Sequence, residues 1–157
     1  MDVIIMLSTT SLLSLLKNNY PQFTFKPGDD FSWSSPENTI YYKKDIDNDV
    51  AFLFHELSHA VLGHTDYDQD IQLITMERQA WDYAINLANS YNITIPDNTV
   101  QTTIDSYRDW LHTRSCCPKC EATGMQFEKI SYICPACNHK WRVNEARLRA
   151  LRRYRLL

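Results

Sequence analysis

The amino-acid sequence predicts an α+β protein with two parts of different character. One H-E-x-x-H motif lies within a helical pattern in the first part, and all five cysteines follow residue 115. Charge changes at the same point, from a net −9 over residues 1–115 to a net +6 over residues 116–157. Two compositional shifts at one position indicate a domain boundary. We therefore expect one domain over residues 1–113, with two metal-ligating helices and a small β-sheet. A second domain is expected over residues 114–157, with a small β ribbon and a basic C-terminal helix.

The beginning of the chain predicts one helix and three strands. Ser8 or Thr9 can cap a helix that runs to about Asn18 and turns its leucines toward a core, and Pro21 ends it. Alternating residues between turn signals predict strands over residues 22–26, 31–34 and 38–44. We expect their aromatic side chains to pack the sheet. Alternatively, the third of these strands lies at an edge and pairs with an extended peptide.

The H-E-x-x-H motif places His55, Glu56 and His59 in an apolar helical stretch that ends near Gly63. Residues four apart on a helix share a face, so both imidazoles can bind one divalent metal ion. Glu56 lies beside them, where a carboxylate can take a proton from water at the metal. The alternative is two ordinary histidines on a half-buried helix, but a carboxylate among apolar residues is costly without a role. The motif therefore predicts a catalytic zinc site with Glu56 as general base.

A third ligand is expected from the next helix, over residues 70–91. Its apolar residues recur at helical spacing, and Glu77 lies on or beside that face. Two histidines and a glutamate form a known catalytic zinc set that leaves a position for water. The alternatives are Asp82 as the ligand, or a solvated Glu77 paired with an arginine. His64 follows His59 by five residues and is expected off the metal-binding face.

Two further expectations concern helix ends. Asp49 and Asp70 precede the helices described above, and acidic residues there are expected to cap the helix N-termini. A third helix is expected to begin at Asn98 or Thr99. The residues expected to face the core from this helix are Ile104, Tyr107, Trp110 and Leu111.

Two stretches together resemble the ImmA/IrrE metallopeptidases. H-E-L-S-H at residues 55–59 and E-R-Q-A-W-D-Y-A at residues 77–84 are similar to that family's H-E-L-x-H and E-x-x-A-x-x-F-A patterns. The similarity covers roughly residues 38–90, although the family's frequent closing Leu-x-Pro is absent. It implies a small zincin-like α+β fold, found in bacteria, phages or mobile elements, that often cleaves a repressor. It also implies zinc ligands and a catalytic base at His55, His59, Glu77 and Glu56.

The cysteines form two C-P-x-C knuckles separated by thirteen residues. This spacing is typical of a structural zinc site, with a hairpin over residues 125–129 and 131–133 between the knuckles. The expected ligands are Cys117, Cys120, Cys134 and Cys137, with Cys116 as the spare thiol and His139 as an alternative ligand. Disulfides are the other alternative, and a reducing cytoplasm disfavours them. Gly124 and Asn138 follow the knuckles, where a left-handed backbone is expected.

The last residues, 144–157, predict a capped helix with Arg149, Arg152 and Arg153 on one side. Either these arginines contact nucleic-acid phosphates, or they stay solvated while the apolar side packs on the protein. A ribbon followed by a basic helix is also similar to the SprT-like proteases that act at DNA, whose further histidine ligand is missing from this sequence.

The motifs together predict a cytoplasmic zinc metallopeptidase with one catalytic and one structural zinc ion. Asp2 replaces the positive start of a signal peptide, and no apolar run is long enough to span a membrane. The expected partners are a protein substrate, such as a DNA-binding repressor, and nucleic acid at the ribbon and tail, with no membrane. His64, Tyr41 and Tyr83 are candidates to assist the oxyanion. The alternatives are a DNA-associated regulator or toxin-like factor that keeps the fold without proteolysis, and an interaction module that uses only the ribbon.

Overall fold

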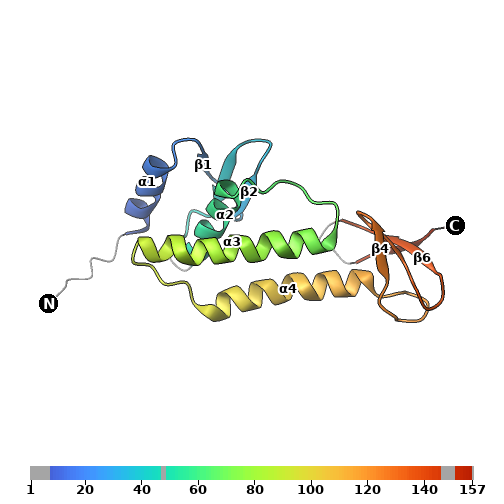
Figure 1. Ribbon diagram of the computed structural model, residues 1–157. Coiled ribbons are helices and arrows are strands. Elements are labelled where there is room, and N and C mark those ends of the chain that lie inside the picture. The colour runs from blue at the N-terminus through green and yellow to red at the C-terminus, as the bar shows by residue number, and fades with distance from the viewer. Residues whose placement is uncertain (1–7, 47–48, 146–150, 157) are drawn as a thin grey trace. The chain divides into compact units, whose positions relative to one another are not determined.

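A computed structural model describes residues 8–46, 49–145 and 151–156 (Figure 1). The chain forms two compact units. One extends to Thr65 and includes Gln79–Ile95, and the other comprises Asp66–Arg78 and the chain from Pro96 onward. Helix α3 (Asp70–Ser90) contributes residues to both units. The boundary expected between residues 113 and 114 stays a prediction.

The first unit opens with helix α1 (Thr9–Asn19), which begins as predicted at the Ser8 cap. The Ser8 hydroxyl accepts a hydrogen bond from the Ser11 amide at 3.3 Å, and this satisfies one of the free amides of the first turn. Leu12 and Leu16 are buried, since residues four apart share a face. Leu15 falls off that face and is 38 % exposed.

Three strands form a mixed sheet in the order β1-β3-β2. They are β1 (Thr24–Pro27), β2 (Ser32–Ser34) and β3 (Thr39–Tyr42). β1 pairs with β3 in parallel and β2 pairs with β3 in antiparallel fashion, so Ile40 of β3 lies opposite both Phe25 and Trp33. The prediction that residues 38–44 could form an edge strand is therefore wrong, because β3 is the central strand. The edges are β1 and β2.

Helix α2 (Val50–Val61) carries the H-E-x-x-H motif and follows the sheet. Leu53, Phe54 and Leu57 have no exposed area, so this helix is held by its apolar face. It ends just before Gly63, whose φ of 68° is the left-handed conformation that ends many helices. Asp49 occupies the N-cap position but makes no side-chain cap hydrogen bond, so the predicted acidic cap is wrong at this helix.

The two long helices follow the predicted periodicity. α3 buries Leu73, and its residues within the first unit, Ala80, Trp81, Ala84 and Ala88, have no exposed area. α4 (Asp97–Ser115) belongs to the second unit and buries Val100, Ile104, Leu111 and Arg114. Two of the four predicted core residues of α4, Ile104 and Leu111, are buried, and Tyr107 and Trp110 are half-buried. Trp110 instead lies beside the Arg114 guanidinium, which is 4.6 Å from its ring centroid.

The second unit ends in a four-stranded antiparallel sheet of order β4-β5-β6-β7, into which α4 leads (Figure 1). Its strands are β4 (Met125–Glu128), β5 (Ser131–Ile133), β6 (Lys140–Val143) and β7 (Arg153–Arg155). The predicted hairpin is present as β4 and β5. The predicted C-terminal helix is wrong over its described part, because Arg153–Arg155 pairs with β6 instead. Residues 146–150, which include Arg149, lie outside the described residues.

The start of α3 is bonded to this sheet within the second unit. The Asp70 amide donates to the Gln126 side chain at 2.8 Å, and the Asp70 carboxylate accepts from the Tyr132 hydroxyl. Lys129 pairs with Asp66 at 2.6 Å. The acidic start of α3 therefore does more than complement the helix dipole, because it also attaches the sheet to that helix turn.

Within the described part of the chain, no helix is both long enough and apolar enough to cross a membrane.

Gly124 should be essential to the second unit for a steric reason. A Cβ at this position would lie 2.3 Å from the buried Trp141 side chain and 3.0 Å from the Ser115 carbonyl. We expect Gly124→Ala to lower the free energy of unfolding by about 1–3 kcal/mol through overpacking. Gly63→Asn is the control, because nothing lies within 4 Å of its Cβ position and Asn tolerates a left-handed backbone. Denaturant unfolding measures both, and equal stability of the two variants would contradict this steric account.

Candidate metal centres

Two histidines of α2 and one glutamate of α3 form the first centre. The Nε2 atoms of His55 and His59 face each other at 3.1 Å, one helical turn apart. With the Glu77 carboxylate they form a group whose ligand atoms all lie within 4.8 Å of one another. Their exposed fractions are only 3 %, 8 % and 4 %. The structure thus brings together the three residues that the sequence singled out, in a buried place.

Trp81 explains how α3 meets the histidines. Its ring stacks on the His55 imidazole, with centroids 4.2 Å apart and planes at 22°. Phe52 of α2 also packs against the Trp81 ring, with centroids 5.8 Å apart. Because residues four apart share a helix face, contact through Trp81 also directs Glu77 toward α2. This role of Trp81 was not predicted, although a tryptophan one turn from a candidate ligand was a signal that could have identified it.

The geometry and chemistry of this donor set fit a zinc ion. Two nitrogens bound at about 2.0–2.1 Å to a tetrahedral zinc lie about 3.3 Å from each other. The Nε2 atoms of His55 and His59 are 3.1 Å apart, so little movement is required to bind one ion. Imidazole nitrogen and carboxylate oxygen are both zinc ligands, and three protein ligands leave one position for water.

Other predicted candidates lie elsewhere in the described structure. Asp82 is exposed and does not belong to the ligand group, so Glu77 is the carboxylate at the histidines. The Tyr41 hydroxyl donates to the Glu37 carboxylate at 2.7 Å, and this bond raises the pKa of Tyr41. Burial, and then the neighbouring Tyr83 and Tyr91, raise the pKa of Tyr20, which follows α1. Neither Tyr41 nor Tyr83 belongs to the ligand group.

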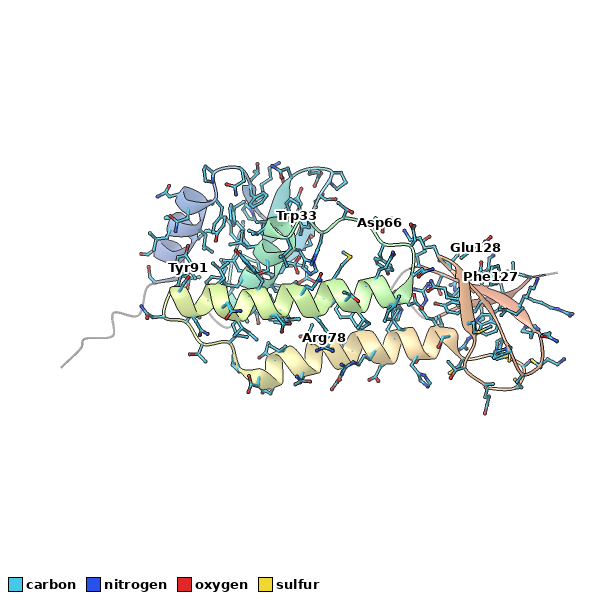
Figure 2. The ribbon with its side chains drawn as sticks, viewed as in Figure 1. Trp33, Asp66, Arg78, Tyr91, Phe127 and Glu128 are labelled. Atoms are coloured by element: carbon cyan, nitrogen blue, oxygen red, sulfur yellow. The ribbon has the colours of Figure 1, made fainter. Side chains whose placement is uncertain are left out.

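His64 does not belong to the ligand group, as expected from its spacing, but it contacts one of the ligands. The left-handed turn at Gly63 brings the His64 Nδ1 atom to 2.8 Å from the Nδ1 atom of His59. The indole of Trp33, labelled in Figure 2, donates to the His64 carbonyl at 2.9 Å and holds this turn against β2. If His59 binds a metal through Nε2, its Nδ1 carries the proton and donates to His64. His64 would then orient a ligand from the side away from the metal.

Glu56 lies between the two histidines in sequence and is half-buried, whereas both imidazoles are buried. A half-buried carboxylate next to a buried ligand keeps access to water. The role of Glu56 as general base stays a prediction, and its position on α2 next to His55 is compatible with that role.

Four cysteines form the second centre. The Sγ atoms of Cys117 and Cys137 are 3.7 Å apart, and Cys120 lies 3.5 and 3.6 Å from Cys134 and Cys137. Sulfurs bound at about 2.3 Å to a tetrahedral zinc lie about 3.8 Å from each other, whereas disulfide sulfurs are about 2.05 Å apart. All five cysteines are free. The four sulfurs therefore have the spacing of a tetrahedral metal site, and the disulfide alternative is excluded for this structure.

The two knuckles share one backbone design. The Glu121 amide bonds to the Cys117 carbonyl and the Asn138 amide to the Cys134 carbonyl, both at 2.9 Å. Glu121 and Asn138 have φ angles of 63° and 55°, so the left-handed position after the first knuckle is Glu121 and not, as predicted, Gly124. Burial raises the pKa of the Cys134 thiol, but the backbone amides after it and the neighbouring thiols outweigh burial and bring it to about 7. A thiolate is thereby favoured at Cys134. At Cys120 a backbone hydrogen bond lowers the pKa, but hydrogen bonds with the other thiols outweigh it and raise the pKa to about 12.

Two side chains that could have competed for the second centre do not belong to the four-sulfur group. Cys116 lies with its Sγ atom 3.7 Å from the His112 Nε2 atom. His139 is half-buried and stacks on Trp141, with centroids 6.2 Å apart. Cys116 is thus the spare thiol, as predicted.

Comparisons of this chain with protein families, with curated proteins and with solved structures find no match. The resemblance to the ImmA/IrrE metallopeptidases therefore depends on the two motifs and on the side chains they bring together.

Metal analysis tests both centres at once. We expect the purified chain to bind two divalent ions, because each donor set can hold one independently. His59→Ala should remove only the first ion and Cys137→Ser only the second. One ion per chain that survives the His59→Ala change would show that the first group does not bind metal.

A second prediction concerns His64. Loss of its imidazole should weaken the first centre by about 10- to 100-fold, the usual effect of removing a group that orients a metal ligand. His64→Ala is the test and His64→Asn the matched control, because an amide oxygen can accept the same hydrogen bond. Competition with a chelator measures the affinity, and the four-cysteine centre of the same molecule serves as internal standard. Equal affinity in all three proteins would leave His64 no orienting role.

Proposed function

We propose that this protein is a zinc-dependent metalloendopeptidase of the ImmA/IrrE type. The observation that carries the proposal is the buried group of His55, His59 and Glu77 with Glu56 next to it on α2. Two imidazoles and a carboxylate whose ligand atoms lie within 4.8 Å of one another are a donor set that zinc uses in catalytic sites. The second centre is proposed to hold a structural zinc ion, since its four ligands are all protein thiols.

Each residue of the first centre has a proposed task. His55, His59 and Glu77 hold the ion and leave one position open. Zinc bound there supplies Lewis acidity, which lowers the pKa of water from about 15.7 toward about 7 and polarises a carbonyl. Glu56 accepts the proton of the attacking water and passes it to the leaving amine. Burial of the ligands strengthens these electrostatic interactions, because little water screens them.

Strand β2 offers a place for an extended substrate. It is an edge strand, so its outer backbone groups are free to pair with a peptide, as β3 cannot. Trp33 of this strand is bonded to the carbonyl of His64, the residue that contacts His59. A peptide added to β2 would therefore be bound near the metal ligands. We propose a folded cytoplasmic protein with an extended segment as substrate, and the family resemblance makes a DNA-binding repressor the first protein to test.

The second candidate function is a DNA-associated regulator that keeps the metal centre without proteolysis. The net +6 charge of residues 116–157 favours it, because such charge attracts nucleic acid whether or not the first centre is catalytic. A Glu56 variant distinguishes the two functions.

Glu56→Gln should abolish proteolysis and leave both metal ions bound, because the amide cannot accept the proton but keeps the size of the side chain. We expect a loss in rate of about 100-fold or more. The measurement is a comparison of protein fragments in host cells that carry the wild type or the variant. A fragment pattern that is the same in both would contradict the peptidase and favour the regulator. Asp82→Asn, an exposed acid outside the ligand group, is the control and should cleave normally.

A further inference from the structure

The C-terminal sheet has one face turned to the core and one turned to solvent. Tyr132, Trp141 and Val143 are buried on the first face, each with at most 1 % exposed area. Because registered partners share a face, strand pairing assigns the opposite side chains to one surface, here called the outer face. The outer face comprises Met125, Glu128, Ser131, Ile133, Lys140, Arg142 and Tyr154, of which Ser131 is buried.

The outer face combines exposed apolar groups with cations. Met125 is 58 % and Tyr154 42 % exposed, so two large side chains of this face are open to solvent. The Arg142 guanidinium lies 5.1 Å from the centroid of the Tyr154 ring, in a cation–π arrangement. Phe127 is also 48 % exposed and follows Met125 on β4, where Figure 2 labels it beside Glu128.

Neither cation of the outer face protects a sheet edge. Arginines on an edge strand can protect a sheet from aggregation, but Lys140 and Arg142 lie on β6, an interior strand. Arg153 of β7, by contrast, has a structural role, because it donates to the Thr113 carbonyl at 2.6 Å. Among the described residues, no ion pair engages Lys140 or Arg142. Their charges are therefore available to a partner.

Charge complementarity identifies the class of partner. The net +6 of residues 116–157 fits a polyanion, and Glu128 is the one carboxylate of the outer face. Tyr154 is exposed, and the Arg142 guanidinium covers one side of its ring, so the other side can stack on a base. A polyanion without bases could not use this stacking surface. A duplex keeps the faces of its bases stacked internally, so it could contact the cations but not the tyrosine.

We propose that the outer face binds single-stranded nucleic acid, with Lys140 and Arg142 at phosphates and a base stacked on Tyr154. This inference is independent of the proposed peptidase, since none of the residues involved belongs to the first metal centre.

The test measures how a fluorescein-labelled 20-nucleotide oligothymidylate binds to the full chain with both metals. Fluorescence anisotropy reports the affinity at salt concentrations from about 50 to about 200 mM. We expect the double change Lys140→Gln and Arg142→Gln to weaken binding about tenfold or more and to lower the salt slope by about 1.4, or about 0.7 per lost phosphate contact. Lys26→Gln with Lys44→Gln removes two exposed cations from the other unit and should leave binding within about twofold.

Substitutions of Tyr154 separate stacking from charge. Tyr154→Ala should weaken binding about fivefold or more, and Tyr154→Phe should retain it, because the phenyl ring still stacks. Metal content and melting temperature confirm that each variant is folded. His59→Ala should bind the oligonucleotide like the wild type, so failure of the peptidase proposal leaves this result unchanged.

Three outcomes would overturn the inference. They are no binding by the wild type, equal binding by the outer-face and control variants, and tighter binding of a duplex of the same length. The last would make the surface a phosphate-binding patch for duplex, without base stacking.

Discussion

The burial of Glu77 is the constraint on which the first metal centre depends. A carboxylate with only 4 % of its surface exposed has lost most of its hydration, so it needs hydrogen bonds or a charged partner. Glu77 and two imidazoles of α2 form a group that could hold a divalent ion, with all ligand atoms within 4.8 Å of one another. The apolar residues of α2 bury the same place, and weak screening there strengthens interactions between charges.

Helix α3 carries residues that contact the C-terminal sheet and a residue of the first centre. Its first turn is bonded to the C-terminal sheet through Asp70, two turns before Glu77. One turn after Glu77, Trp81 stacks on His55. Asp70 and Glu77 both belong to the part of α3 in the second unit, so one stretch of helix carries the attachment to the sheet and the candidate ligand carboxylate.

The end of α2 shows how a helix terminus can complete a site. Gly63 adopts a left-handed backbone, which places His64 against His59 rather than farther along the helix axis. The Trp33 indole donates to the His64 carbonyl in this turn, so the sheet supports the residue that contacts His59. Second-sphere partners of this kind fix the tautomer of a metal-binding histidine. Gly63 therefore both ends α2 and allows His64 to contact His59.

The local sequence determined much of this protein. Helical periodicity predicted α1, α2, α3 and α4 to within a few residues, and the spacing within H-E-x-x-H and C-P-x-C determined which ligands lie together, because both are properties of a few consecutive residues. Glu77 could also be named in advance, since helix periodicity placed it on or beside the apolar face.

Only the tertiary structure decided the features that depend on distant partners. β3 became the central strand because β1 crosses over to pair with it in parallel, which strand periodicity does not encode. His64 reached His59 only through the turn at Gly63 and the support of Trp33, thirty-one residues away. The C-terminal segment has a helical pattern, yet Arg153–Arg155 is a strand. The backbone groups of Arg153–Arg155 form hydrogen bonds with those on the outer side of β6, which would otherwise lack a strand partner. Long-range hydrogen bonding outweighed local helix propensity there, and no pattern within the segment itself reports that competition.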